Sequence, residues 1–285
     1  VDETSIIGFA IGLSHNGFIP IPEIQFLAYY HNAQDQLRGE AATLSFFSRG
    51  KFANPMVLRI PGLAYQRGFG GHFHNENSLT VFRDVPGIIL AVPSNGPDAV
   101  KMMRTAVKEA YEHGRIIIFV EPIALYTQKD LYKKGDKKWS FSYPSLEKEI
   151  GIGQYAVYGS GKELVIITYG NGLYLSLKAK KEIERMLRKK IKVVDLRWLS
   201  PINVSKLVEE LDNSKYVLIV DECRRTGCYG EGLLVKLIEK SKKPLNIKLH
   251  AAEDSFISLG PSSTVTLPSK ASIVKNAISL VNEQN

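Results

Sequence analysis

The stretch Ile116-Ile117-Ile118-Phe119-Val120 says most about the fold of this 285-residue chain. A strand with one face in water alternates apolar and polar residues, whereas these five residues are all apolar. They therefore predict a strand buried on both faces inside a parallel sheet. Residues 98–113, just before it, have helical spacing, with Pro97 in the initiating turn and Gly114 at the end. A helix leading into a buried strand is typical of α/β folds.

The same alternation of strands and helices extends over most of the chain. The other expected strands are residues 19–24, 56–60, 88–93, 164–170, 191–196, 216–221 and 245–249. The other expected helices are residues 26–47, 173–189, 204–211, 230–241 and 270–281. Strands separated by crossover helices imply a parallel, doubly wound sheet, and we predict two such α/β domains in series.

The composition changes between about Gln128 and Glu149, where a charged run breaks the periodicity and is followed by Ser142-Tyr143-Pro144-Ser145. We expect this segment to be a linker, because domain boundaries fall in polar stretches of this kind. The first domain is then residues 1–127, the linker 128–149 and the second domain 150–285.

Charge and cysteine content exclude several classes of protein. The formal charge is +8, but the lysines are dispersed over predicted helical faces without interleaved aromatics, which favours solvated helix surface over nucleic-acid binding. Cys223 and Cys228 cannot make a disulfide framework or a four-ligand zinc site. No apolar stretch approaches the ~20 residues that cross a bilayer. We expect a protein of a reducing compartment, the cytoplasm, and a processed organellar protein would look the same.

The run from Glu3 to Gly12 places a carboxylate at the edge of a small, apolar segment that resembles the opening of a buried helix. Burying a carboxylate is costly, and its pKa rises unless a cation is near. Glu3 is therefore either a frayed terminal residue or a functional acid. Because the chain begins at Val1, we also expect that it has been processed or is a fragment.

Two further places carry candidate site residues. The early helix includes the run Glu23-Ile24-Gln25-Phe26-Leu27-Ala28-Tyr29-Tyr30. Gln25 and Tyr29 are four residues apart in this run, so they would share one face. An amide beside an aromatic ring suits a flat heteroaromatic ligand, although an amphipathic core helix is the plainer interpretation. His72 and His74 lie in a glycine-rich loop without a third metal ligand nearby. Each is either a solvated loop residue or a catalytic base.

The order of the motifs resembles a known family. Glu3-x-x-Ile-Ile-Gly-x-Ala-Ile-Gly is followed by Glu23-Ile-Gln-Phe-x-x-Tyr, Gly70-Gly-x-x-His and Phe119-Val-Glu-Pro-x-x-Leu-Tyr. Asp221-Glu-Cys-Arg-x-Thr-Gly comes in the second half. Together they resemble the β subunit of thiamine-diphosphate-dependent 2-oxo acid dehydrogenases, in the transketolase-like superfamily. The resemblance implies a pyrimidine-binding domain followed by a transketolase-type carboxy-terminal domain.

The resemblance also implies roles for particular residues. Glu3 matches the glutamate that hydrogen-bonds the aminopyrimidine ring of thiamine diphosphate and promotes formation of the ylid. Tyr29 matches the ring that packs against the pyrimidine, and Gln25 a neighbouring polar contact. His74 matches the histidine that assists the reaction and acyl transfer. His72 departs from the family pattern, so its role stays open.

The function implied is oxidative decarboxylation of a 2-oxo acid with transfer of the acyl group to a lipoyl protein. The family's Gly-Asp-Gly motif for Mg²⁺ is absent, so an α subunit or an upstream region should hold the metal and the diphosphate. We then expect an oligomer with an α partner and a lipoyl-bearing acyltransferase, and poor cofactor binding by the lone chain. Transketolase-type ketol transfer and a non-catalytic assembly subunit are the alternatives.

Overall fold

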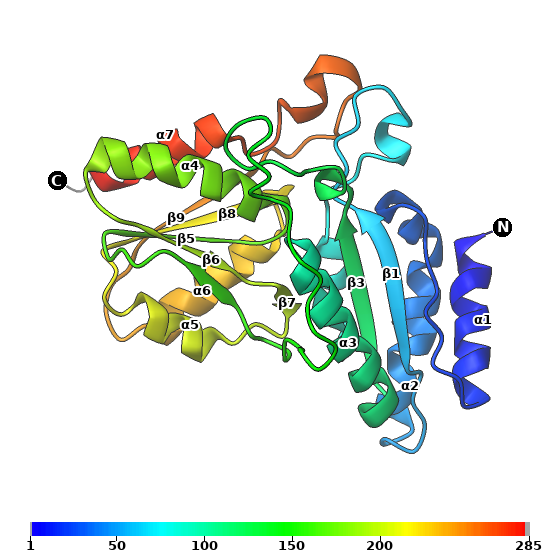
Figure 1. Cartoon of the computed structure of the whole chain (residues 1–285). Coiled ribbons are helices and arrows are strands. Elements are labelled where there is room, and N and C mark those ends of the chain that lie inside the picture. Colours follow the sequence, from blue (N-terminus) through cyan, green and yellow to red (C-terminus); the bar gives the residue numbers. More distant parts are fainter. Residues whose placement is uncertain (1, 283–285) are drawn as a thin grey trace.

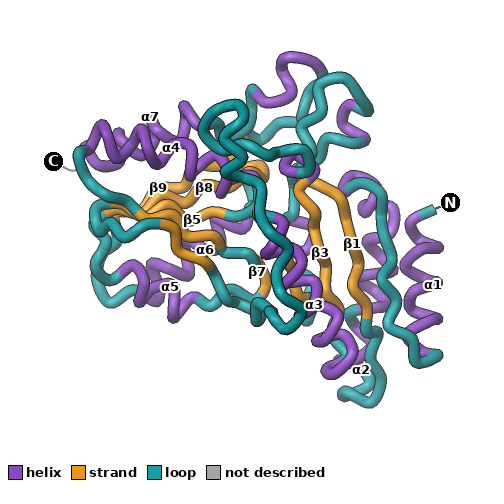
Figure 2. Tube along the Cα trace, in the orientation of Figure 1, coloured by secondary structure: helices purple, strands orange, loops and turns teal. Residues whose placement is uncertain are grey.

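The computed structural model describes residues 2–282 and arranges them around two sheets (Figure 1). Within these residues, the first sheet has the strand order β1-β3-β2-β7 and the second the order β4-β6-β5-β8-β9. Helices lie on both faces of the second sheet, with α4 and α7 on one side and α5 and α6 on the other (Figure 2). The predicted class, two α/β domains with mostly parallel sheets, is confirmed.

The centre of the first sheet is the stretch that predicted it. β3 (Ile116–Pro122) lies between β1 (Met56–Gly62) and β2 (Ile89–Ala91) and runs parallel to both. Its first five residues are buried, as expected. α3 (Gly96–His113) leads into it, beginning where the Asn95 side chain accepts the Asp98 N–H and ending at Gly114 in the left-handed region.

The long helix predicted over residues 26–47 is wrong. The chain forms a 3₁₀ helix η1 (Leu27–Ala33), a π-helical turn η2 (Gln36–Ala41) and a short α2 (Thr43–Phe47). The Ala42 N–H bonds the Leu37 carbonyl five residues earlier, so the helical ladder shifts by one residue there. Gly39 lies inside the π turn, and glycine lowers helix propensity by about 1 kcal/mol.

The expected strand at residues 19–24 is also wrong. Its residues lie beside β1 and accept hydrogen bonds from Val57 and Arg59 through the carbonyls of Pro20 and Pro22. A proline has no N–H to donate, so the pairing cannot continue as a ladder, and it is reduced to one bridge between Glu23 and Arg59.

The helix predicted at Glu3 exists as α1 (Glu3–His15), but it is not a buried helix. It forms an outer edge of the molecule (Figure 1). Ile7, Ala10 and Ser14 are buried along one side, whereas Phe9 is 71% exposed. The small and apolar residues that suggested burial therefore face outward on part of this helix.

In the second half, every predicted strand and helix is present within a few residues. The strands are β5 (Leu164–Thr168), β6 (Lys192–Asp195), β8 (Tyr216–Arg224) and β9 (Asn246–Ala252), all parallel. The helices are α4 (Asn171–Leu187), α5 (Val204–Leu211), α6 (Tyr229–Lys240) and α7 (Lys270–Asn282). Short 3₁₀ helices are η3 (Gly71–Phe73), η4 (Thr80–Phe82), η5 (Ile123–Leu125) and η6 (Gly260–Thr264).

Two antiparallel strands of three residues each were not predicted. β4 (Ala156–Tyr158) pairs with β6, and β7 (Trp198–Ser200) leaves the second half to pair with β2 in the first sheet. Next to β7, Arg197 makes an ion pair with Asp98 at 2.7 Å. The two halves are thus joined by a shared sheet. None of the helices in residues 2–282 is long and apolar enough to cross a membrane.

Candidate active site

Side chains on one side of η1 contact two of the predicted site residues, Glu3 and His74. In a 3₁₀ helix, residues three apart lie above one another, so Tyr29 and Asn32 project from the same side of η1. The Asn32 amide donates to the Glu3 carboxylate at 3.1 Å. The Tyr29 hydroxyl lies 3.2 Å from Nε2 of His74. Contacts made by η1 therefore link the start of α1 to the glycine-rich loop.

Glu3 is held in the first turn of α1. The Asp2 side chain caps this helix by accepting the Thr4 N–H at 2.9 Å, and the Thr4 hydroxyl donates to the Asn32 carbonyl at 2.9 Å. Glu3 is partly buried, and a carboxylate is favoured at a helix N-terminus by the helix dipole. These contacts fix the direction of the Glu3 side chain, so in this structure Glu3 is not a frayed terminal residue.

His74 is enclosed by aromatic rings and by a glycine. Its ring centroid lies 4.3 Å from that of Phe26 and 4.5 Å from that of Phe69. A Cβ on Gly70, which has φ +78°, would come within 1.8 Å of Nδ1 of His74. That buried Nδ1 has no hydrogen-bond partner among the described residues. Buried polar atoms are usually bonded, and this one instead packs against Gly70.

The other two candidate residues stand apart from this group. Gln25 lies before η1 and is exposed, so the expectation that it shares a helical face with Tyr29 is wrong. His72 is exposed, and its ring packs on Phe73 with centroids 4.0 Å apart. Neither makes a side-chain hydrogen bond within residues 2–282.

The base of the glycine-rich loop is clamped by residues that the sequence analysis missed. The Asn75 side chain accepts the Gln66 N–H at 2.9 Å and donates to the Gln66 carbonyl at 2.8 Å. Glu76 makes an ion pair with Arg224 at 2.9 Å. The sequence feature that could have revealed these residues is the polar run Asn75-Glu76-Asn77 directly after His74. All three residues are buried in the structure. The carboxy-terminal half therefore holds the loop that carries His74.

Asn77 extends this clamp to a buried pair of carboxyl groups at the end of β8. Its amide donates to the Glu222 carbonyl at 2.6 Å. The Glu222 carboxyl accepts the Tyr65 hydroxyl and, at 2.9 Å, the Asn171 N–H at the start of α4. Burial, with the neighbouring charge of Asp221, raises the pKa of Glu222 to about 8. Asp221 accepts the Gly230 N–H at 2.7 Å near the start of α6.

Metal and thiol chemistry have little support in the described part of the chain. No three His, Cys, Asp or Glu side chains within residues 2–282 converge as a metal site would require. Cys223 and Cys228 are free and buried, and burial raises the pKa of both thiols, that of Cys228 to about 12. Thiolates are the reactive form, so neither cysteine is suited to nucleophilic or redox chemistry.

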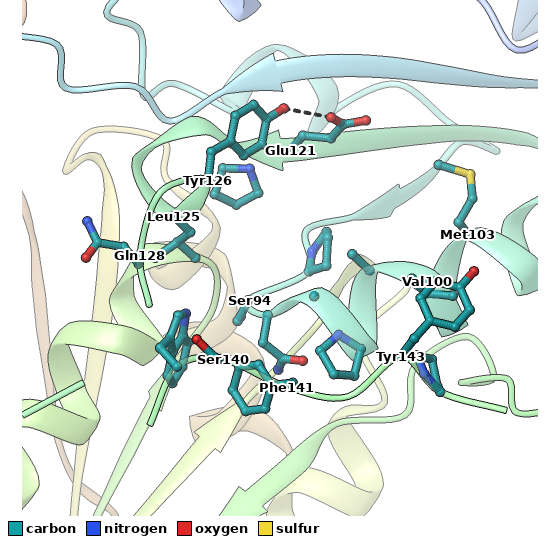
Figure 3. Close-up of a pocket in the computed structure, with 18 of the residues that line it drawn as sticks. Ser94, Val100, Met103, Glu121, Leu125, Tyr126, Gln128, Ser140, Phe141 and Tyr143 are labelled. Atoms are coloured by element: carbon teal, nitrogen blue, oxygen red, sulfur yellow. Dashed lines mark hydrogen bonds between the residues drawn. The ribbon is translucent and has the colours of Figure 1, made fainter. Parts of the chain in front are cut away.

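A cavity of about 830 Å³ lies away from the candidate site, between the carboxyl ends of β2 and β3, the start of α3 and residues 139–144 (Figure 3). Glu3, Tyr29 and His74 are not among its lining residues. Its wall is mostly apolar and aromatic, and several of its polar groups are already bonded within the chain. The Tyr126 hydroxyl, for example, donates to Glu121 at 2.7 Å.

Comparisons with known proteins agree with this organisation. Residues 1–128 match the family described as transketolase, pyrimidine binding domain, and residues 153–262 match transketolase, C-terminal domain. The chain is 27% identical over 282 residues to the pyruvate dehydrogenase E1 component subunit beta of Staphylococcus epidermidis (strain ATCC 35984) and to that of Staphylococcus aureus (strain Mu50). Each alignment covers 96% of this chain and 80% of the relative.

A solved structure gives the same result for the fold. A chain described as a split gene transketolase, inactive β4 tetramer, superposes with a TM-score of 0.75 at 19% sequence identity. The superposition covers 100% of this chain and 83% of that chain. The chain belongs to the transketolase-like superfamily, and it is homologous to the β subunits of thiamine-diphosphate-dependent 2-oxo acid dehydrogenases.

Proposed function

We propose that this chain is the β component of an enzyme that oxidatively decarboxylates a 2-oxo acid and passes the acyl group to a lipoyl protein. The observation that carries the proposal is the connection of Glu3, Tyr29 and His74 through one side of η1. All three residues lie within the part of the chain that matches the pyrimidine-binding family. The similarity to pyruvate dehydrogenase β subunits supports the reaction class.

The residues present fit thiamine diphosphate. An aminopyrimidine needs a carboxyl group for its ring nitrogen and an apolar or aromatic wall, and Glu3, Tyr29 and Phe26 are groups of these kinds. When bound, thiamine diphosphate supplies an electron sink for the electron pair released as the 2-oxo acid loses carbon dioxide.

The residues of this chain would then bind, orient and move protons. Glu3, oriented by Asn32, would share a proton with the pyrimidine nitrogen. Tyr29 would pack against the ring, and Gln25 would supply a polar contact from its exposed position. His74, positioned by the Tyr29 hydroxyl at Nε2, would assist acyl transfer by donating or accepting a proton.

Mg²⁺ and the diphosphate need oxygen ligands from elsewhere. Hard cations prefer carboxylate and carbonyl oxygens. Residues 2–282 contain no cluster of three or more His, Cys, Asp or Glu side chains that could hold a metal ion. We therefore propose that an α subunit, or an α-like region of the same protein, completes the site. The chain alone should bind the cofactor weakly, and tight binding should require that partner.

The decisive experiment compares Glu3→Gln with Glu40→Gln in the enzyme reconstituted with its α partner. Glu40 is exposed and lies outside the connected group, so its substitution is a matched control. Loss of a proton-sharing acid should lower the release of carbon dioxide from a labelled 2-oxo acid about 10²-fold or more. Unchanged turnover in Glu3→Gln would instead favour the non-catalytic assembly subunit.

A further inference from the structure

The net charge of this chain resides in two segments that are distant in sequence. Residues 129–138 contain five lysines and two aspartates, a formal charge of +3. Residues 178–190 contain seven basic and two acidic side chains, a formal charge of +5. These two values account for the whole formal charge of +8, so the remainder of the chain is formally neutral.

The fold brings the two segments together. Lys181 on α4 lies with its Nζ 3.4 Å from the centroid of the Tyr132 ring. The Tyr174 hydroxyl, also on α4, donates to the Asp130 carbonyl at 2.8 Å. α7 packs beside α4, as Figure 1 shows, and adds Lys270. We name residues 129–138 and 178–190 together with Lys270 the basic surface.

The acidic side chains of loop 129–138 are used to organise the loop. Asp130 accepts the N–H groups of Gly135 and Lys137, and Asp136 accepts that of Leu131. The five lysines of this loop are exposed, and none forms an ion pair within residues 2–282. The lysines therefore remain available to a partner.

The basic surface also contains a depression of about 430 Å³ where cations converge. Its lining residues are Tyr132, Lys178, Lys181, Glu182, Arg185 and Lys270. Glu182 is paired with Lys270 at 2.7 Å, and Lys178, Lys181 and Arg185 form no ion pair within residues 2–282. We propose that the basic surface binds an acidic polypeptide segment of a partner protein, with carboxylate side chains entering this depression. Surfaces of opposite charge accelerate encounter and fix orientation.

The covering of the tyrosine rings favours a polypeptide over a nucleic acid. Single-stranded nucleic acids bind through bases stacked on aromatic rings. The two tyrosine rings here are already covered, Tyr132 by Lys181 and Tyr174 by Lys178 at 4.8 Å. Carboxylates at the ends of Glu and Asp side chains are small enough to reach the cations that line the depression.

The test uses the whole chain and fluorescein-labelled decaglutamate, with binding followed by fluorescence anisotropy. Charge reversal of Lys178, Lys181 and Arg185 to Glu should weaken binding by about tenfold or more. The control reverses Lys236, Lys240 and Lys242, which changes the net charge equally on another face and should leave binding within about twofold. Raising the salt concentration should weaken binding to the unmodified chain.

A second variant guards against misfolding of the first. Substitution of Lys133, Lys134 and Lys137 by Gln changes only exposed loop side chains and should also weaken decaglutamate binding, with an unchanged circular dichroism spectrum. The proposal is overturned if the control variant loses as much affinity as the charge reversal. It is also overturned if decauridylate or phosphatidylserine vesicles bind the chain more tightly than decaglutamate.

Discussion

The Glu222 carboxyl, which contacts both halves of the chain, should make the stability of the fold depend on pH. Its carboxyl is buried between the Tyr65 hydroxyl from the first half and the Asn171 N–H at the start of α4. Burial raises the pKa of this group to about 8 from 4.5. We predict that Glu222→Gln increases stability at alkaline pH, because glutamine has the shape of the protonated acid and never ionises.

The sign and size follow from proton linkage. Between pH 4.5 and about 8, the unfolded chain has released the Glu222 proton and the folded chain still holds it. The folded state therefore binds more protons, and stability falls as pH rises through this window. The contribution is fully present below pH 4.5 and lost above pH 8. Each pKa unit corresponds to about 1.4 kcal/mol, so the total loss is about 5 kcal/mol.

The assay is urea unfolding of the unmodified chain and of Glu222→Gln at several pH values from 5 to 9, followed by tryptophan fluorescence. The difference in free energy of unfolding should grow with pH and level off above pH 8. Glu239→Gln, on the exposed side of α6, is the control and should show no such growth. A difference between Glu222→Gln and the unmodified chain that stays constant with pH would refute the reasoning, since it would mean that Glu222 is ionised in the folded state.

The remaining predictions concern the glycine-rich loop and the thiols. Gly70→Ala should cost about 1–3 kcal/mol of stability in urea unfolding, because φ is +78° and the new Cβ would overlap the ring of the candidate histidine. Gly68→Ala is its control, since a Cβ there meets no atom within 4 Å, and equal losses would contradict the packing argument. Cys223 and Cys228 should not react with a disulfide reagent at pH 8 until the chain is unfolded, because both are buried and burial raises the pKa of both thiols. Rapid labelling of the native chain would show that one of them is accessible.

Local patterns were sufficient for most of the architecture. The five apolar residues 116–120 predicted the central strand of the first sheet, because a strand without polar residues is stable only when both faces are covered. The helices and parallel strands of the second half followed from hydrophobic periodicity in the same way. Where local chemistry competed with periodicity, prediction failed. The prolines at 20 and 22 prevented the strand that the apolar spacing favoured, and residues 26–47 form 3₁₀, π and α segments where that spacing favoured one helix.

The candidate site was only partly visible in the sequence. Motif order identified Glu3, Tyr29, Gln25 and His74 as candidates, and their roles remain proposals. It gave no indication that Asn32 would join Glu3 to the side of η1 that carries Tyr29. Nor did it show that Gln25 would lie before that helix.

What the sequence determined by itself is the class of fold and the identity of the chemical groups, because periodicity and residue type are local properties. The tertiary structure decided which distant groups meet. The Glu76–Arg224 ion pair joins residues 148 positions apart, and the entry of β7 into the first sheet depends on three residues too few to give a periodic signal. Contacts of this kind form because whole elements pack together, and the spacing of residues along the chain does not specify them.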